Sequence, residues 1–85
     1  MEIEYTSHFK RIYQKLPLAV QKKAEKQETV FRNNPLDQRL DTHKLHGKLK
    51  AFYSFSVDRR YRIVFQFLTK ERAVFLDVGD HDVYR

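Results

Sequence analysis

The 85-residue sequence contains no cysteine, no tryptophan and only two residues each of glycine and proline. The lack of cysteine excludes disulfide bonds and any metal site built from thiolates. No apolar run approaches the roughly 20 residues of a membrane-spanning helix, and residues 1–5 have neither the basic nor the apolar region of a secretion signal. Repeats, linkers and low-complexity segments are also absent. We therefore expect a single domain over residues 1–85, in a cytoplasmic protein without membrane contact.

Acidic residues are scarce relative to basic ones. There are 17 Lys and Arg residues against 11 Asp and Glu, which gives a formal net charge of +6. So large a positive charge on a short chain favours an anionic partner, either a nucleic acid or an acidic protein. Seven Phe and five Tyr, within 41% hydrophobic residues, indicate a globular domain with an aromatic-rich core.

The first part of the chain is predicted to form one strand and two helices. Met1, Ile3 and Tyr5 alternate with glutamates, the pattern of a short strand with one buried face. Ser7 is placed to cap a first helix, and Pro17 suits the first position of a second helix that runs to Arg32. The predicted buried stripes are Phe9, Ile12, Tyr13 and Leu16 on the first helix, and Val20, Ala24, Gln27 and Phe31 on the second.

The rest of the chain changes from loop to strands. Residues 36–47 have no apolar period and predict a loop with at most a helical turn. Residues 51–57, 61–68 and 73–79 are rich in Phe, Tyr, Val and Ile and are separated by short polar connections. This arrangement predicts three strands in an antiparallel meander.

The middle strand is predicted to have two different faces. Tyr61, Ile63, Phe65 and Phe67 share the face that should pack on the helices, and Arg62, Val64, Gln66 and Leu68 share the other. The second face combines apolar side chains with an arginine. We therefore expect an open, partly apolar concave surface there that a second protein could cover.

Cations, imidazoles and a phenol are concentrated near the strand ends and in the terminal segment. They are His43, Lys44, His46, Lys48 and Lys50 in the loop, Arg60 and Arg62 on the middle strand, and His81 and Tyr84 at the end. This inventory suits a phosphodiester handled without a metal, because side chains can supply both charge stabilisation and proton transfer.

These residues also have simpler interpretations. His43 and His46 are three residues apart and near Asp41, a spacing that a metal could use, but histidines in exposed loops are usually solvated. The sequence therefore predicts no metal and no cofactor. Arg59 and Arg60 lie at a turn, where solvated charges are common, and Tyr84 could equally cover the edge of the sheet.

The order of these segments resembles the RelE/ParE superfamily of type II toxins, including its YafQ-like branch. The similarity rests on His-Lys-Leu-His-Gly-Lys-Leu-Lys (43–50), Arg-Tyr-Arg-Ile-Val-Phe-Gln-Phe (60–67) and Val-Gly-Asp-His-Asp-Val-Tyr (78–84). It implies a small α+β domain of order β-α-α-β-β-β, an antiparallel sheet with two N-terminal helices packed on one face. It also implies a cognate antitoxin and, for RelE and YafQ-like toxins, metal-independent cleavage of mRNA in the ribosomal A site.

The resemblance assigns roles to individual residues. In this reaction the ribose 2′-hydroxyl attacks the adjacent phosphorus, so the enzyme must remove its proton, stabilise the added negative charge and protonate the leaving 5′-oxygen. Arg62 matches the phosphate-stabilising arginine, Tyr84 the C-terminal tyrosine, and His43 and His81 two histidines of the YafQ-like pattern. Of the two C-terminal groups, His81 is the better acid or base, because imidazole titrates near neutral pH. The implied RNA contacts are Lys44, His46, Lys48, Lys50, Arg59 and Arg60.

One departure keeps two function classes open. RelE-like enzymes carry lysines on the strand that here reads Phe52-Tyr53-Ser54-Phe55-Ser56, and the nearest lysines in this chain are Lys48 and Lys50. The presence of Arg62, His81 and Tyr84 favours an mRNA endoribonuclease. The missing lysines favour a ParE-type gyrase inhibitor without catalysis, or an attenuated homologue that acts only through antitoxin binding.

Overall fold

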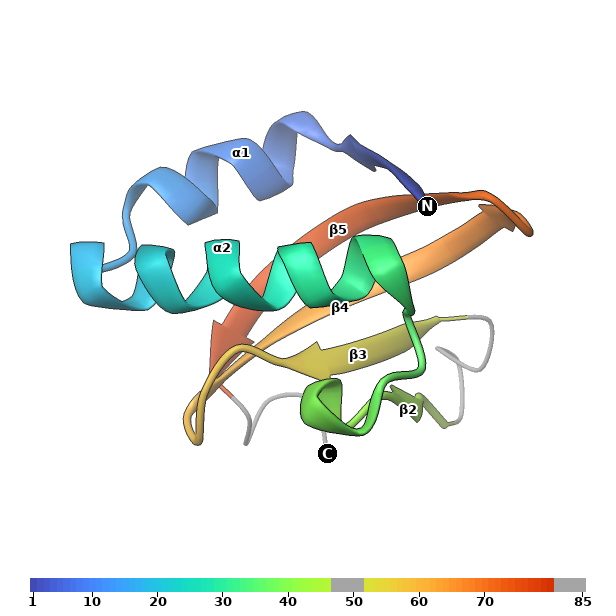
Figure 1. The fold of residues 1–85 in the computed structure, drawn as a ribbon. Coiled ribbons are helices and arrows are strands. Elements are labelled where there is room, and N and C mark those ends of the chain that lie inside the picture. The colour runs from blue at the N-terminus through green and yellow to red at the C-terminus, as the bar shows by residue number, and fades with distance from the viewer. Residues whose placement is uncertain (47–51, 81–85) are drawn as a thin grey trace.

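A computed structural model describes residues 1–46 and 52–80, and its helices lie in front of a five-stranded sheet (Figure 1). The helices are α1 (Ser7–Gln14), α2 (Leu18–Asn33) and the short 3-10 helix η1 (Gln38–Leu40). The strands are β1 (Glu2–Tyr5), β2 (His43–Lys44), β3 (Tyr53–Ser56), β4 (Tyr61–Thr69) and β5 (Arg72–Asp80). Within the described residues, no helix is long and apolar enough to cross a membrane.

Both helix starts differ by one residue from the prediction. Thr6, not Ser7, caps α1, because Thr6 has extended backbone and its Oγ1 accepts from the Phe9 N–H at 3.0 Å. Pro17 is the cap of α2 and not its first helical residue, since its ψ of 144° is extended. The backbone N–H groups of Val20 and Gln21 donate to the Pro17 carbonyl, so the helix begins directly after it.

The predicted buried faces of the two helices are confirmed. Phe9 is buried on α1, while Ile12, Tyr13 and Leu16 pack against the core from partly buried positions. On α2, Val20, Ala24 and Phe31 are buried, and Gln27 donates through Nε2 to the carbonyls of Arg39 and Ser56, each at 2.9 Å. Glu28 and Arg32, four residues apart on α2, form an ion pair at 3.1 Å. The side-chain amide of Gln27 therefore ties α2 to η1 and β3.

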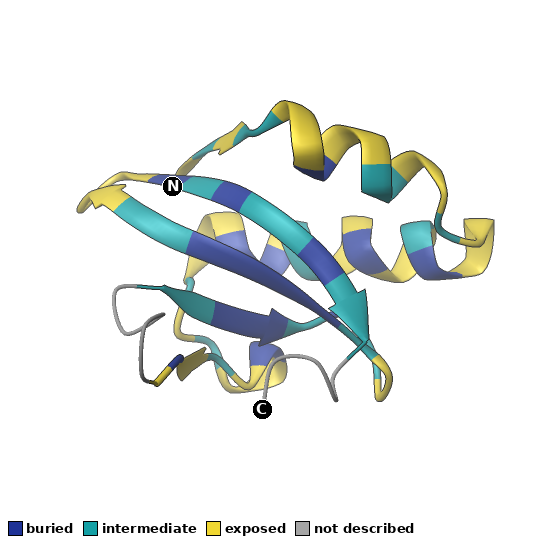
Figure 2. Ribbon diagram, turned by 180° about the vertical axis from the view of Figure 1, so that it is seen from behind, coloured by how far each residue is buried: buried dark blue, intermediate teal, exposed yellow. Residues whose placement is uncertain are grey.

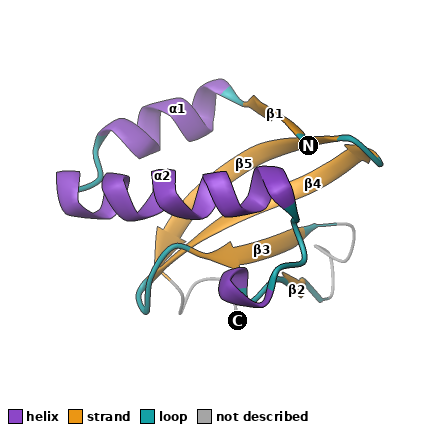
Figure 3. Cartoon of the chain, in the orientation of Figure 1, coloured by secondary structure: helices purple, strands orange, loops and turns teal. Residues whose placement is uncertain are grey.

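The sheet order is β1-β5-β4-β3-β2. The antiparallel meander of β3, β4 and β5 is confirmed. The sheet as a whole is mixed and not antiparallel as expected, because β1 pairs with β5 in parallel. The loop after η1 also contributes a strand that was not predicted, the two-residue β2, antiparallel to β3. The predicted helical turn in this loop is η1. Figure 3 shows η1 and β2 beside β3, at the edge of the sheet opposite β1.

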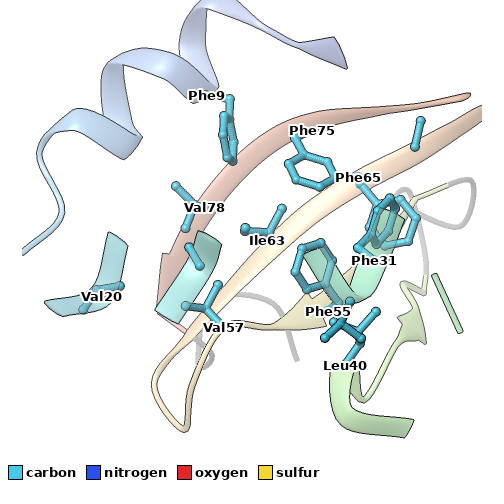
Figure 4. Packing of buried hydrophobic residues seen from close by; sticks show 13 residues of the cluster. Phe9, Val20, Phe31, Leu40, Phe55, Val57, Ile63, Phe65, Phe75 and Val78 are labelled. Carbon is cyan, nitrogen blue, oxygen red and sulfur yellow. The ribbon is translucent and has the colours of Figure 1, made fainter. Parts of the chain in front are cut away.

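The core lies between the helices and the front face of the sheet (Figure 4). Phe31 of α2 is fully buried, and its ring centroid lies 5.1 Å from Phe55, 4.9 Å from Phe65 and 5.2 Å from Phe75. Each buried phenylalanine contributes about 1.5–3 kcal/mol relative to an exposed one. Since these rings come from α2 and three different strands, they fix the helix on the sheet.

Candidate functional site

The site is built around Arg62, near the start of β4. Its neighbours Ile63 and Tyr61 pack in the helix-side core, so Arg62 extends from the opposite face, as the alternation predicted. However, the side chain of Arg62 is only 4% exposed. Val64 on the same face is also buried. In the view from behind, the middle of β4 has the dark blue of buried residues (Figure 2). The prediction of an open concave surface at Arg62 and Val64 is therefore wrong.

Four hydrogen bonds occupy the Arg62 guanidinium. Nε donates to Ser54 Oγ at 2.9 Å, and Nη2 donates to the carbonyls of Asp41 at 2.6 Å and Ser54 at 3.2 Å. Nη1 lies 3.4 Å from Asp41 Oδ2, the longest of the four contacts. Ser54 is in reach because β3 and β4 are antiparallel with Ser54 opposite Val64. The groups that surround Arg62 are thus decided by the face of β4 on which it lies and by the register in which β3 pairs with β4.

Asp41 connects the arginine to His43. It follows η1 in a left-handed conformation, with φ 49° and ψ 51°, which Asp tolerates better than most residues. Its Oδ1 lies 3.0 Å from His43 Nε2. His43 belongs to β2 and is paired with Ser54 of β3. We call Arg62, Asp41, His43 and Ser54 the Arg62 cluster.

Two members of the Arg62 cluster were missed as site residues by the sequence analysis. Asp41 was noted only as a neighbour of two histidines, and Ser54 only as part of the strand that lacks the lysines of RelE-like enzymes. Both contact Arg62 because of strand pairing between segments far apart in sequence. A polar residue at position 54, on the face opposite the aromatic core, was the one available signal.

The predicted RNA-binding residues lie in two places. Lys44 and His46 are exposed, and Lys44 sits opposite Tyr53 at the start of β3. Arg59 and Arg60 are exposed in the turn that follows β3, at its other end. Arg60 forms an ion pair with Asp80 at 3.1 Å and lies over the Tyr61 ring at 5.7 Å, and the hydrogen bond with Asp80 raises the pKa of Arg60. The predicted RNA-binding residues that the structure describes therefore form two separate groups, one near each end of β3.

Four predicted site residues lie outside the described residues. They are Lys48, Lys50, His81 and Tyr84. Among residues 1–46 and 52–80, no three His, Asp or Glu side chains are grouped so that they could hold a metal ion. Asp41, His43 and His46 therefore do not form such a group there.

A separate cavity of about 350 Å³ lies on the helix side of the sheet. The residues that line it come from both helices and from β1, β4 and β5. They are Tyr5, Phe9, Lys10, Tyr13, Gln14, Ala24, Glu25, Glu28, Ile63 and Phe75. Tyr5 donates to Glu28 Oε1 and accepts from Arg32 at 3.2 Å. Burial, followed by the hydrogen bond to Glu28, raises the pKa of Tyr5 to about 12, so its hydroxyl stays protonated at neutral pH. Among residues 1–46 and 52–80, none of the predicted site residues lines this cavity.

Solved structures with the same fold are toxins. A YoeB/ParE toxin from Agrobacterium tumefaciens superposes with a TM-score of 0.78 at 15% identity, covering 95% of this chain and 99% of that one. YafQ from E. coli strain BL21(DE3) gives 0.72 at 22% identity, covering 96% and 94%. This chain has the fold of these toxins. The RelE–RelB complex from the archaeon Pyrococcus horikoshii OT3 provides a third match, with a TM-score of 0.74, 16% identity and coverage of 93% and 92%.

No protein-family profile and no curated protein sequence matches the chain. The first two structural matches cover 95% and 96% of this chain. The structural matches therefore confirm the predicted fold, whereas the roles of individual residues rest on the site itself.

Proposed function

We propose that this protein is the toxin of a type II toxin–antitoxin pair and that it cleaves mRNA on the ribosome without a metal. The proposal is supported by the toxin fold over nearly the whole chain, together with the contact that brings His43 into the Arg62 cluster. A proton-transfer group and a fixed positive charge then lie within one cluster, as cleavage by a 2′-hydroxyl requires. This observation carries the proposal.

In the proposed reaction His43 removes the proton of the 2′-hydroxyl. Arg62 stabilises the charge that builds on the phosphate, and His81 protonates the leaving 5′-oxygen, with Tyr84 positioning the ribose or a base. A phosphate oxygen would bind Arg62 at Nη1, where the existing contact is longest. Because the Arg62 side chain is 4% exposed, the phosphate oxygen would have to displace Asp41 Oδ2 from Nη1, while Asp41 Oδ1 stays at His43.

The proposed partners are a cognate antitoxin and ribosome-bound mRNA. Solved relatives of the fold include toxins in complex with their antitoxins, such as the RelE–RelB and DinJ–YafQ complexes. A protein with a formal charge of +6 is attracted to RNA generally, and an acidic partner suppresses that attraction. The cations proposed to contact RNA are Lys44, His46, Lys48, Lys50, Arg59 and Arg60.

Two observations favour a function without catalysis. The strand from Tyr53 to Ser56 contains no lysine, and the arginine that would contact phosphate is enclosed by Asp41 and Ser54. Both features fit a ParE-type inhibitor of DNA gyrase, which needs no catalytic groups. They also fit an attenuated toxin that acts only by binding its antitoxin.

Expression without antitoxin separates these functions. For the nuclease we expect growth arrest, new mRNA 5′ ends inside reading frames, and loss of both in a folded His43→Gln or His81→Gln variant. His8→Gln is the matched control, because His8 lies at the start of α1 and pairs with Asp77 on a different part of the surface. Growth arrest with intact mRNA and blocked gyrase supercoiling would establish the inhibitor. Normal growth with antitoxin binding retained would establish the attenuated toxin.

A further inference from the structure

Asp41 contacts two residues of the proposed site at once. One carboxylate oxygen lies 3.0 Å from His43 Nε2 and the other 3.4 Å from Arg62 Nη1. The resemblance to the toxin family assigned no role to this residue, and the sequence offered none beyond a neighbour of histidines. Its place between a cation and an imidazole is a property of the tertiary structure.

The backbone of Asp41 is held firmly although its side chain is 63% exposed. Its N–H donates to the Gln38 carbonyl at 3.2 Å, which closes η1, and its carbonyl accepts from Arg62 Nη2 at 2.6 Å. The left-handed conformation turns the chain so that β2 can begin two residues later. An exposed ion pair alone would orient its partners little. Here the backbone that carries the carboxylate is held on both sides, which limits the positions that the carboxylate can take.

His43 is fixed from the other side. Strand β2 pairs with β3, and His43 lies opposite Ser54, the residue that also binds Arg62. The backbone of Asp41 is thus held by Arg62, and that of His43 by its pairing with Ser54, which itself binds Arg62. The sheet therefore keeps the two side chains within reach of each other, with Oδ1 and Nε2 3.0 Å apart.

This geometry selects one tautomer of the histidine. A neutral imidazole has one N–H and one lone pair, and the nitrogen that faces a carboxylate carries the hydrogen. We infer that Asp41 is a positioning residue that holds His43 as the Nε2–H tautomer and leaves Nδ1 to accept the proton of the attacking hydroxyl. The carboxylate then stabilises the imidazolium, as it does in other carboxylate–histidine pairs.

The inference rests on the proposed nuclease function, in which the 2′-hydroxyl attacks the adjacent phosphorus. The 2′-O–H bond breaks and its proton moves to Nδ1, while the oxygen forms a bond to phosphorus. The bond between phosphorus and the 5′-oxygen then breaks, and that oxygen takes a proton from the general acid. The products are a 2′,3′-cyclic phosphate and a 5′-hydroxyl, with no further reactant.

The first test measures the tautomer in the free protein by the imidazole nitrogen chemical shifts, at a pH where His43 is neutral. The His43 signals are assigned by their loss in His43→Gln. We expect the Nε2–H tautomer in the wild type and in Asp37→Asn, the matched control, which removes a carboxylate from the same segment. In Asp41→Asn the amide can donate as well as accept, so the Nδ1–H tautomer should gain population. An Nδ1–H wild type, or a tautomer unchanged by Asp41→Asn, would overturn the inference.

The second test measures cleavage of ribosome-bound mRNA by the same variants. Asp41→Asn should lower kcat by about 10–100-fold at unchanged KM, as expected for a group that acts through another. Asn tolerates the left-handed backbone and keeps the carbonyl contact with Arg62, and thermal melting would verify the fold. Full activity of Asp41→Asn would overturn the inference alone. An inactive wild type would instead overturn the nuclease proposal, whatever the tautomer.

Discussion

Arg62 shows how burial changes the expected effect of a mutation. The residue lies on the face of the sheet away from the helices, yet its side chain is only 4% exposed. In the structure it is bound to Ser54 and Asp41 by four hydrogen bonds and joins β4 to β3 and to the segment after η1. Its removal would leave buried Ser54 without its guanidinium partner.

We predict that Arg62→Ala lowers the free energy of unfolding by about 1.5–3 kcal/mol, the range for a hydrogen bond to a charged group. The measurement is urea denaturation followed by circular dichroism. Arg60→Ala is the control, since that side chain is 72% exposed and its ion pair with Asp80 should contribute little to stability. Equal stability of the two variants would show that the Arg62 contacts contribute little. Loss of toxicity in Arg62→Ala is meaningful for catalysis only after correction for this loss of stability.

At the scale of elements, the turn between β3 and β4 is organised by Asp58. Its Oδ1 accepts from the backbone N–H groups of Arg60 and Tyr61, each at 2.8 Å, and its Oδ2 lies 3.7 Å from Lys23 of α2. Burial by itself would raise the pKa of Asp58, but the Tyr61 and Arg60 N–H groups and Lys23 together lower it. The turn sets the register that brings Ser56 opposite Arg62.

We predict that Asp58→Ala lowers the free energy of unfolding by roughly 1–3 kcal/mol, because two backbone donors lose their acceptor. Asp58→Asn retains an acceptor oxygen and should lose less. A lowered folded-state pKa gives stability that is present above the ordinary value of 3.8 and is lost as pH falls toward the lowered one. The stability difference between wild type and Asp58→Asn should therefore shrink on going from neutral pH to about pH 3. Denaturation curves across this range would contradict the prediction if the difference stayed constant.

At the scale of the whole molecule, the positive charge is unevenly placed. Lys44 and His46 are exposed on the segment that also contributes Asp41 and His43 to the Arg62 cluster. Lys22 and Lys26 are exposed on α2, which covers the other face of the sheet. The net charge of +6 attracts any anionic partner, but steering depends on the cations nearest to the contact. A partner that blocks the proposed site should therefore respond to Lys44 and not to Lys22.

We predict that association with the cognate antitoxin is fast at low salt and slows as salt increases, while dissociation changes little. Lys44→Gln should slow association and weaken its salt dependence, and Lys22→Gln should leave both unchanged. Binding kinetics over a salt series would provide the comparison. The same response in both variants would show that the antitoxin reads only the net charge, or that it binds another surface.

Local periodicity determined most of the fold from sequence. The stripes on α1 and α2 and the alternation on β4 depend only on residues within a few positions of each other, so the buried Phe9, Phe31, Ile63 and Phe65 could be identified without coordinates. The predicted start of each helix was wrong by one residue. For α1 the reason is that Thr6 and Ser7 are both good caps, and the backbone conformation decides between them. The parallel partner of β1 and the two-residue β2 were not predictable, since strand pairing is not encoded locally.

The sequence by itself determined the inventory of the site: an arginine on β4, a histidine in the loop and an excess of positive charge. The tertiary structure decided that Arg62 is enclosed and that Asp41 stands between it and His43. Asp41 and Arg62 are 21 residues apart, and Ser54 and Arg62 are eight apart. Such contacts arise only when the register of β2, β3 and β4 is fixed, and that register is set by the packing of the whole core.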